Sequence, residues 1–203
     1  ESAMGDSEAT DPLVRVAAAR NAELVRTGRR LLSKVRDSMQ RIPFRLERAG
    51  ALDRMLLLEE QRLALGGSRT IGPQLRQELA GLGQLDLLAA DLEAIRREML
   101  EDYLLEIELG DEIVRLQDPR VRAAQIVADS GLDLDDPGPV IDRLSTLLET
   151  RRSVLVRPLL SQLRQALALR DEEARATVAL LDALRSYRAF VLENLLAIRT
   201  GPP

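Results

Sequence analysis

The sequence predicts an all-α fold, an elongated helical bundle or antiparallel coiled coil of long helices without a sheet. Hydrophobic residues make up 45% of the chain but aromatic residues only 2%, so a core must consist almost entirely of Leu, Ala, Val and Ile. Charged residues make up a further 31%, and the apolar residues recur at spacings of three and four, as on a helix surface. This combination is typical of long helices that pack along narrow seams.

A first helix is expected over residues 11–41. Asp11 can cap it, and Pro12 can occupy the first helical position, where a missing N–H costs nothing. Alternating steps of four and three predict a coiled-coil seam, in which Asn21 sets the register and Gly28 allows a close helix approach. The predicted seam consists of Val14, Ala18, Asn21, Val25, Gly28, Leu32, Val35, Met39 and Ile42.

Pro43 is expected to end this helix, because proline disfavours helical geometry at the preceding residue and lacks a backbone donor. A second, Leu-rich helix should then cover residues 44–65. Residues 11–65 are therefore predicted to form a helical hairpin. Residues 1–10 are expected to be a tag remnant and a disordered start of a piece taken from a longer protein.

The densest cluster of glycine and proline, residues 66–73, predicts a connecting turn. A phosphate-binding loop is the weaker interpretation, because the cluster lacks a preceding strand and a Gly-Lys-Ser/Thr ending. Residues 74–131 should form one long helix to about residue 117, with Gly81 and Gly83 as possible kinks, and then one short helix. The short helix should begin at the Asp118–Pro119 cap and stop at Gly131.

The aspartates of residues 132–139 raise the question of a calcium loop. Counted from Asp133, the required glycine is present as Gly138, but Leu144 stands where the twelfth-position glutamate belongs. A capped, solvated turn is therefore the favoured interpretation, and no metal ligand is predicted.

Residues 139–199 should form long helices. One apolar face comprises Ile141, Leu144, Leu148, Leu155, Leu159, Leu163 and Leu167, and another comprises Val178, Leu181, Leu184, Tyr187, Val191, Leu195 and Ile198. Pro158 should kink the first part. Periodicity leaves open whether the segment is one rod or turns back near Arg170, and we favour a break there.

The composition argues against most enzyme classes. The chain has no His and no Cys, which removes the common zinc sites, thiol nucleophiles and His-based acid/base pairs. Its carboxylates stand among arginines and are expected on solvated helix faces; examples are Glu59, Glu60, Asp102, Glu106, Glu172 and Glu173. We therefore expect no enzyme, no catalytic residues, no cofactor, no metal and no identifiable small-molecule substrate.

The charge and hydropathy patterns limit the partners. A net charge of −4 with both signs interspersed provides no basic face for nucleic acid. No uninterrupted apolar run approaches the roughly 18 residues that a bilayer span needs. A lipid-surface module is also disfavoured, because it calls for a basic amphipathic face.

The segment Tyr187–Ile198 resembles a motif of a known family. Tyr-Arg-Ala-Phe-Val-Leu-Glu-Asn-Leu-Leu-Ala-Ile is similar to the segment that closes the periplasmic helical domain of the large MscS-family mechanosensitive channels. Matching positions are Tyr187, Arg188, Phe190, Glu193, Leu195 and Leu196. Ala197 stands where the family has a tryptophan, a favoured membrane-interface anchor. Glu106–Pro119 resembles a helix end and Asp-Pro turn found upstream in such domains.

The resemblance implies the periplasmic domain of a bacterial inner-membrane channel that opens under tension and releases osmolytes. It implies a homo-oligomer, a heptamer in this family, and a membrane attachment through a segment outside this chain. The domain would act structurally, by transmitting force, or by binding a periplasmic partner. The alternative is a soluble coiled-coil scaffold or adaptor with no channel.

Overall fold

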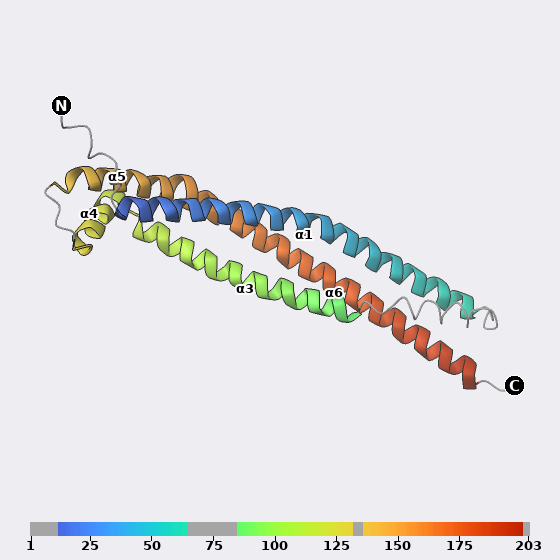
Figure 1. The fold of residues 1–203 in the computed structure, drawn as a ribbon. Coiled ribbons are helices and arrows are strands. Elements are labelled where there is room, and N and C mark those ends of the chain that lie inside the picture. Colours follow the sequence, from blue (N-terminus) through green and yellow to red (C-terminus); the bar gives the residue numbers. More distant parts are fainter. Residues whose placement is uncertain (1–11, 65–84, 132–135, 201–203) are drawn as a thin grey trace, which may run out of the picture. The chain divides into compact units, whose positions relative to one another are not determined.

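The computed structural model describes residues 12–64, 85–131 and 136–200, and for residues 196–200 it describes the backbone only. Within these ranges the chain is helical and has no strand, so the predicted all-α bundle of long helices is confirmed (Figure 1). The elements are α1 (Pro12–Ala64), α3 (Leu85–Arg115), α4 (Pro119–Asp129), α5 (Gly138–Thr150), the π-helix η1 (Arg151–Val156) and α6 (Arg157–Thr200).

The chain divides into two compact units. Unit 1 combines Glu1–Lys34 with Glu101–Leu167, and unit 2 combines Val35–Leu100 with Ala168–Pro203. Each unit therefore contains segments that are far apart in the sequence, and each has its own core. The two are described separately below.

The predicted helix break at Pro43 is wrong, and with it the helical hairpin of residues 11–65. Helix α1 is continuous and contains Pro43. Pro43 has no N–H, so the Met39 carbonyl four residues earlier lacks its helical hydrogen-bond donor. Both Pro43 and Met39 are exposed, and water can therefore solvate that carbonyl. Ser38 and Arg45 on either side are bonded to α6, which holds both flanking turns in helical geometry.

The buried face of α1 differs from the predicted seam at every second position. Asn21, Gly28, Val35 and Ile42 are partly buried, as predicted, but Val25, Leu32 and Met39 are exposed. The residue before each of these is buried instead. Buried positions recur every seven residues from Ala17 through Leu24, Leu31 and Ser38 to Arg45, and Glu59 follows fourteen residues later. Ala49 is also buried but lies off this period.

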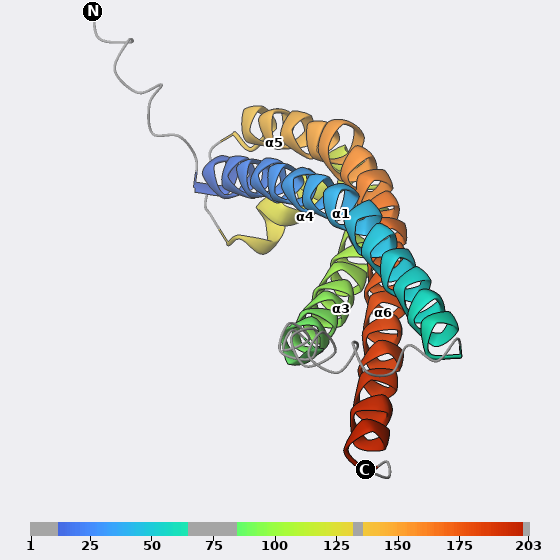
Figure 2. The same ribbon diagram turned by 90° about the vertical axis from the view of Figure 1, so that its right-hand side faces the viewer.

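The core of unit 1 joins residues of four segments. Helices α4 and α5 lie side by side, and the N-terminal part of α1 and the end of α3 pack on them (Figures 1 and 2). The buried residues are Ala17, Leu116, Ala123, Val127, Leu144 and Leu148. A Cβ at Gly28 would lie 3.6 Å from Leu159, an ordinary van der Waals distance, so the packing there does not require a glycine and the predicted close approach is not borne out.

The turn between α3 and α4 agrees with the sequence-based prediction. Asp118 caps α4, accepting hydrogen bonds from the backbone N–H groups of Arg120 and Val121. Pro119 occupies the first helical position. Gly131 follows the helix with a φ of 64°, in the left-handed region that favours glycine.

Residues 138–200 form an uninterrupted helical path from α5 through η1 into α6 (Figure 2). The break favoured near Arg170 is therefore wrong, because α6 passes through that position. An irregularity was predicted at Pro158, and the helix is irregular directly before this residue, in the π-helix η1. There the Arg157 N–H donates a hydrogen bond to the Arg152 carbonyl. A π-turn re-pairs backbone groups that a proline would otherwise leave without partners.

The core of unit 2 joins α1, α3 and α6. Its fully packed members are Ala49, Leu180, Ala183, Leu184, Tyr187 and Val191, with Leu52, Leu56, Leu85 and Leu88 against them. Contacts of Arg45 with Asp91 and Thr177, and of Arg170 with Glu98, show that α3 runs antiparallel to α6.

Some predictions fall outside the described residues. They are the cap at Asp11, the turn of residues 66–73, the kinks at Gly81 and Gly83, and the first half of the aspartate-rich turn, residues 132–135. Asp136 is described and accepts a hydrogen bond from the Gly138 N–H at 3.0 Å.

Replacing Pro43 should test how α1 accommodates its proline. Pro43→Ala restores a backbone donor for the Met39 carbonyl and removes the ring clash, so we expect the free energy of unfolding to rise by about 1–2 kcal/mol. Urea denaturation followed by circular dichroism measures the change.

The matched control is Gln40→Ala, at an exposed position less than one turn earlier. It should change stability by no more than about 0.5 kcal/mol. A Pro43→Ala protein less stable than the wild type would contradict this account and mean that unit 2 needs a bend that Pro43 causes.

Candidate functional site

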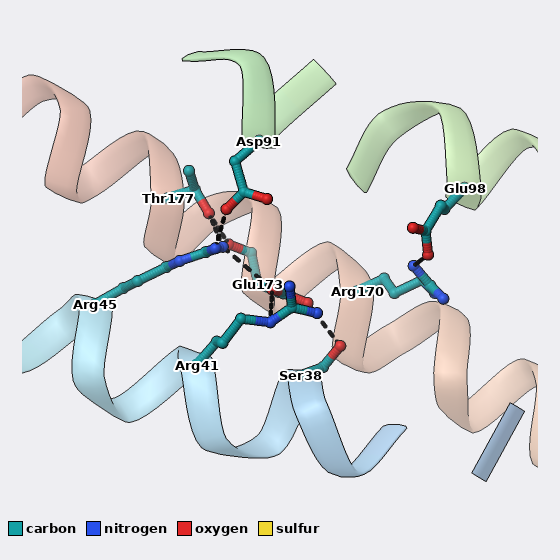
Figure 3. A network of polar contacts seen from close by, with 8 residues as sticks. All are labelled: Ser38, Arg41, Arg45, Asp91, Glu98, Arg170, Glu173 and Thr177. Atoms are coloured by element: carbon teal, nitrogen blue, oxygen red, sulfur yellow. Dashed lines mark hydrogen bonds and ion pairs between the residues drawn. The ribbon is translucent and has the colours of Figure 1, made fainter. Parts of the chain in front are cut away.

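The most unusual feature of unit 2 is a carboxylate, Glu173 of α6, with no exposed surface. Its Oε2 accepts a hydrogen bond from the Ser38 hydroxyl at 2.6 Å. Its Oε1 lies 2.9 Å from Arg41 Nε and 3.2 Å from Arg45 Nη1. Both oxygens are thus bonded by side chains of α1 (Figure 3).

Arg45 extends this contact to α1, α3 and α6, the helices of the unit that the structure describes. Its guanidinium also donates to Thr177 Oγ1 on α6 and to Asp91 Oδ2 on α3. The Thr177 hydroxyl in turn donates to the Glu173 carbonyl at 2.7 Å. We call Ser38, Arg41, Arg45, Asp91, Glu173 and Thr177 the Glu173 network.

A neighbouring ion pair repeats the link between α3 and α6. The side chain of Arg170 is 4% exposed, and its Nη1 lies 2.5 Å from Glu98 Oε2 (Figure 3). The arginine of this pair comes from α6, whereas in the Glu173 network the arginines come from α1.

The charges of the Glu173 network cancel, since two guanidinium groups face two carboxylates. Burying a charge costs several kcal/mol unless it is paired and hydrogen-bonded, and here both conditions are met. The oxygens of Glu173 accept bonds from protein donors, and the side chain has no exposed surface from which to reach a substrate. The arrangement therefore suits the alignment of three helices better than proton transfer.

Three carboxylates expected on solvated faces are buried instead. Glu59, Asp102 and Glu173 are at most 7% exposed, so the expectation is wrong for them. Glu60 and Glu172 are exposed, as predicted, and Glu106 is half-buried and lies 2.7 Å from Arg164. Arginine partners, such as Arg62 for Glu59, make such burial possible.

Unit 1 contains a second polar centre around Arg151, the first residue of η1. Its Nε donates to Asn21 Oδ1 at 2.7 Å, its Nη1 to Glu112 at 3.1 Å and its Nη2 to the Ala17 carbonyl at 2.9 Å. Asn21 also donates to the Leu147 carbonyl. The predicted register-setting role of Asn21 therefore has a visible basis.

Hydrogen bonding within exposed ion pairs shifts a few pKa values. The bond from Arg20 lowers the pKa of Glu23, and the same bond raises the pKa of Arg20. A bond to Asp171 raises the pKa of Arg175. Because the pKa of Glu23 is lowered on folding, its small contribution to stability is present at neutral pH and is lost as the pH falls through that pKa.

The predicted motif residues fall into two groups. Tyr187 is 2% exposed, and its ring stacks on that of Phe190 with centroids 6.4 Å apart. Leu195 packs partly against the same cluster, whereas Arg188 and Glu193 are exposed. The side chain of Leu196 lies outside the described part. The structure therefore joins the apolar motif residues and leaves the charged ones on the surface.

Two further surveys cover the described part of the chain. No set of three or more His, Cys, Asp or Glu side chains is placed there to hold a metal ion. No helix among those residues has a stretch long and apolar enough to cross a membrane.

Comparison with protein-family models, curated proteins and solved structures found no match to this chain.

The Glu173 network was missed because apolar periodicity marks only apolar positions. A usable signal existed, since the predicted apolar faces end at Leu167 and resume at Val178, and steps of three, three and four from Leu167 select Arg170, Glu173 and Thr177. The same interpolation on α1, at steps of seven from Ala17, selects Ser38 and Arg45. Polar residues at interpolated core positions of facing helices indicate a buried network.

Removing the charge of Glu173 should destabilise unit 2 strongly. Glu173→Gln leaves the Arg45 guanidinium buried with one anionic partner fewer, so we expect a loss of about 3 kcal/mol in the free energy of unfolding. Chemical denaturation measures the loss.

Glu172→Gln is the matched control, because the adjacent side chain is exposed and the substitution is identical. Its effect should stay within about 0.5 kcal/mol. Equal effects of the two substitutions would show that the network contributes nothing beyond a surface charge.

Proposed function

We propose that this chain is a periplasmic helical domain of an MscS-type mechanosensitive channel, where it has a structural, force-transmitting or partner-binding role in osmotic protection. The observation that carries the proposal is the similarity of Tyr187–Ile198 to the segment that closes such domains. In that family the segment precedes the first membrane helix. The pore would then lie in parts of the protein beyond this chain.

The packing of the motif supports this proposal. Tyr187 and Phe190 hold the C-terminal part of α6 against Ala49 and its neighbours in unit 2. A motif that closes a domain needs such anchoring, because a displacement at its end passes into the domain only through packed side chains.

The Glu173 network supports a force-transmitting role. A shift of one helical turn, about 5.4 Å, would remove Glu173 from its donors on α1 and leave buried charges unpaired. Sliding of α6 along α1 within unit 2 is therefore costly. Close-packed helices that resist sliding pass small displacements on instead of absorbing them.

A soluble coiled-coil scaffold or adaptor is the second candidate. The exposed apolar side chains of α3, such as Ile107 at 62% and Val114 at 69%, favour it, because scaffolds bind partners through such faces. The two candidates differ in where the full-length protein is located and in whether it conducts ions.

Cysteine labelling tests the location, and this chain has no cysteine of its own. In the full-length protein in intact bacteria, a Cys at exposed Gln165 should react with a small maleimide that cannot cross the inner membrane. The buried neighbour Ala166, at 1% exposure, is the matched control, and a Cys there should stay unlabelled until the protein is unfolded. Labelling of Gln165→Cys only after lysis would overturn the periplasmic assignment.

Conductance tests the channel itself. In patches of membrane reconstituted with the full-length protein, we expect conductance that appears under tension. Glu173→Gln should shift the tension threshold while Glu172→Gln leaves it unchanged, because only the first loosens the packing of unit 2. A full-length protein that purifies without membranes and conducts no ions would favour the scaffold.

A further inference from the structure

Unit 1 contains a hollow of about 260 Å³ to which α1, α3, α4, α5 and η1 all contribute. Four arginines and one carboxylate line it, namely Arg20, Arg115, Arg122, Arg151 and Glu112. The rest of the lining is apolar and belongs to the core of the unit or packs against it; it comprises Leu116, Ile126 and Leu148. The hollow therefore combines an apolar part anchored in the core with a strongly basic part. We call it the arginine hollow.

Local structure brings these arginines to one place. Arg115 is the last residue of α3 and Arg122 lies in the first turn of α4, so the short turn at Asp118 separates them. Arg151 comes from η1, where its bonds to Asn21 and to other groups of unit 1 fix the guanidinium. The side chains that line the arginine hollow are thus positioned before any ligand arrives.

Two of the four arginines are already neutralised within the unit. Glu112 Oε1 lies 3.1 Å from Arg151 Nη1, and Glu112 Oε2 lies 3.7 Å from Arg20 Nη2. Arg20 also pairs with Glu23 at 2.8 Å, and Glu108 attracts it more weakly. Arg20 and Arg151 therefore do not count as free cations.

The other two arginines have no carboxylate within ion-pairing distance in the part of the chain that the structure describes. Arg122 donates a hydrogen bond to the neutral Gln125 Oε1 at 3.3 Å. Asp111 and Asp118 stand one turn before Arg115 and Arg122, but neither forms an ion pair with them. Asp118 Oδ1 instead accepts the backbone N–H groups at the start of α4. Two guanidinium groups thus line the arginine hollow without an anionic partner.

We propose that the arginine hollow binds the dianionic phosphate group of a small soluble compound. Guanidinium groups bind phosphate oxygens through paired, charge-assisted hydrogen bonds. Two of them without partners match the charge of about −1.5 to −2 that a phosphomonoester carries at pH 7. A phosphodiester, as in a phospholipid headgroup, carries a single charge and matches less well.

The size of the arginine hollow and the place of Glu112 agree with such a ligand. Its volume is several times the roughly 30 Å³ of one water molecule, so a phosphate and part of its organic remainder fit. Glu112 opposes an anion, but both of its oxygens are engaged by Arg151 and Arg20. The proposal concerns unit 1 alone and does not depend on the assignment to a channel.

Calorimetric titration of the complete chain with inorganic phosphate tests the site, with the ionic strength held constant by potassium chloride. We expect saturable binding with one phosphate per chain. Arg115→Gln and Arg122→Gln should each weaken this binding at least about tenfold, the loss expected when a hydrogen bond to a charged group disappears.

Urea denaturation separates a ligand-binding role from a structural one. Because neither arginine has an ionic partner in the described part, both variants should unfold at the same urea concentration as the wild type in phosphate-free buffer. Phosphate should raise the midpoint of the wild type and raise that of the variants less, since a ligand of the folded state stabilises it.

Arg143→Gln is the matched control, because Arg143 is exposed on α5, does not line the arginine hollow and loses the same charge. It should bind phosphate like the wild type. Sedimentation with vesicles of phosphatidylglycerol distinguishes a lipid headgroup from a soluble phosphate, and we expect no vesicle binding that Arg115→Gln abolishes.

Three results would overturn the proposal. One is the absence of saturable binding by the wild type at millimolar phosphate. Another is an equal loss of affinity in Arg143→Gln and Arg115→Gln, which would mean that phosphate responds only to the net charge. The third is vesicle binding that depends on Arg115 without any binding of free phosphate.

Discussion

Unit 2 depends on the neutralisation of one buried carboxylate. Glu173 has no contact with water, and a bare charge in that position would oppose folding by several kcal/mol. Ser38, Arg41 and Arg45 satisfy it only when α1 presents that face to α6. Arg45 needs a second anion, which α3 supplies as Asp91. The rotation of α1 and the place of α3 follow from this one requirement.

The two internal prolines show how long helices tolerate residues that normally end them. Pro43 lies on the solvent side of α1, so the lost backbone bond is open to hydration. Pro158 is also exposed, and it follows a π-turn, which re-pairs the neighbouring backbone groups. The distortion at Pro158 also coincides with Arg151, whose guanidinium joins α1 and α3 in unit 1. Proline thus modifies these helices without dividing them.

The exterior of the described part differs from its interior. Buried networks align helices within each unit, while apolar side chains of α3, such as Ile107 and Val114, are exposed. The proposed function rests on Tyr187–Ile198 and does not depend on these exposed residues.

The sequence by itself determined the cap at Asp118 and the stop at Gly131, because these depend on local backbone geometry. It also determined the all-α class and most of the apolar residues of α6 that are buried, because these depend on the helical period. The seam predicted for α1 was wrong at Val25 and Leu32, since Leu24 and Val25, like Leu31 and Leu32, are adjacent apolar pairs that support either of two faces. Only the tertiary structure chose between them, because the face that carries Ser38 and Arg45 must meet Glu173. The same contacts made α1 continuous at Pro43. Helical period can mark the positions of buried charges, but it does not show which residue of one helix pairs with which residue of another.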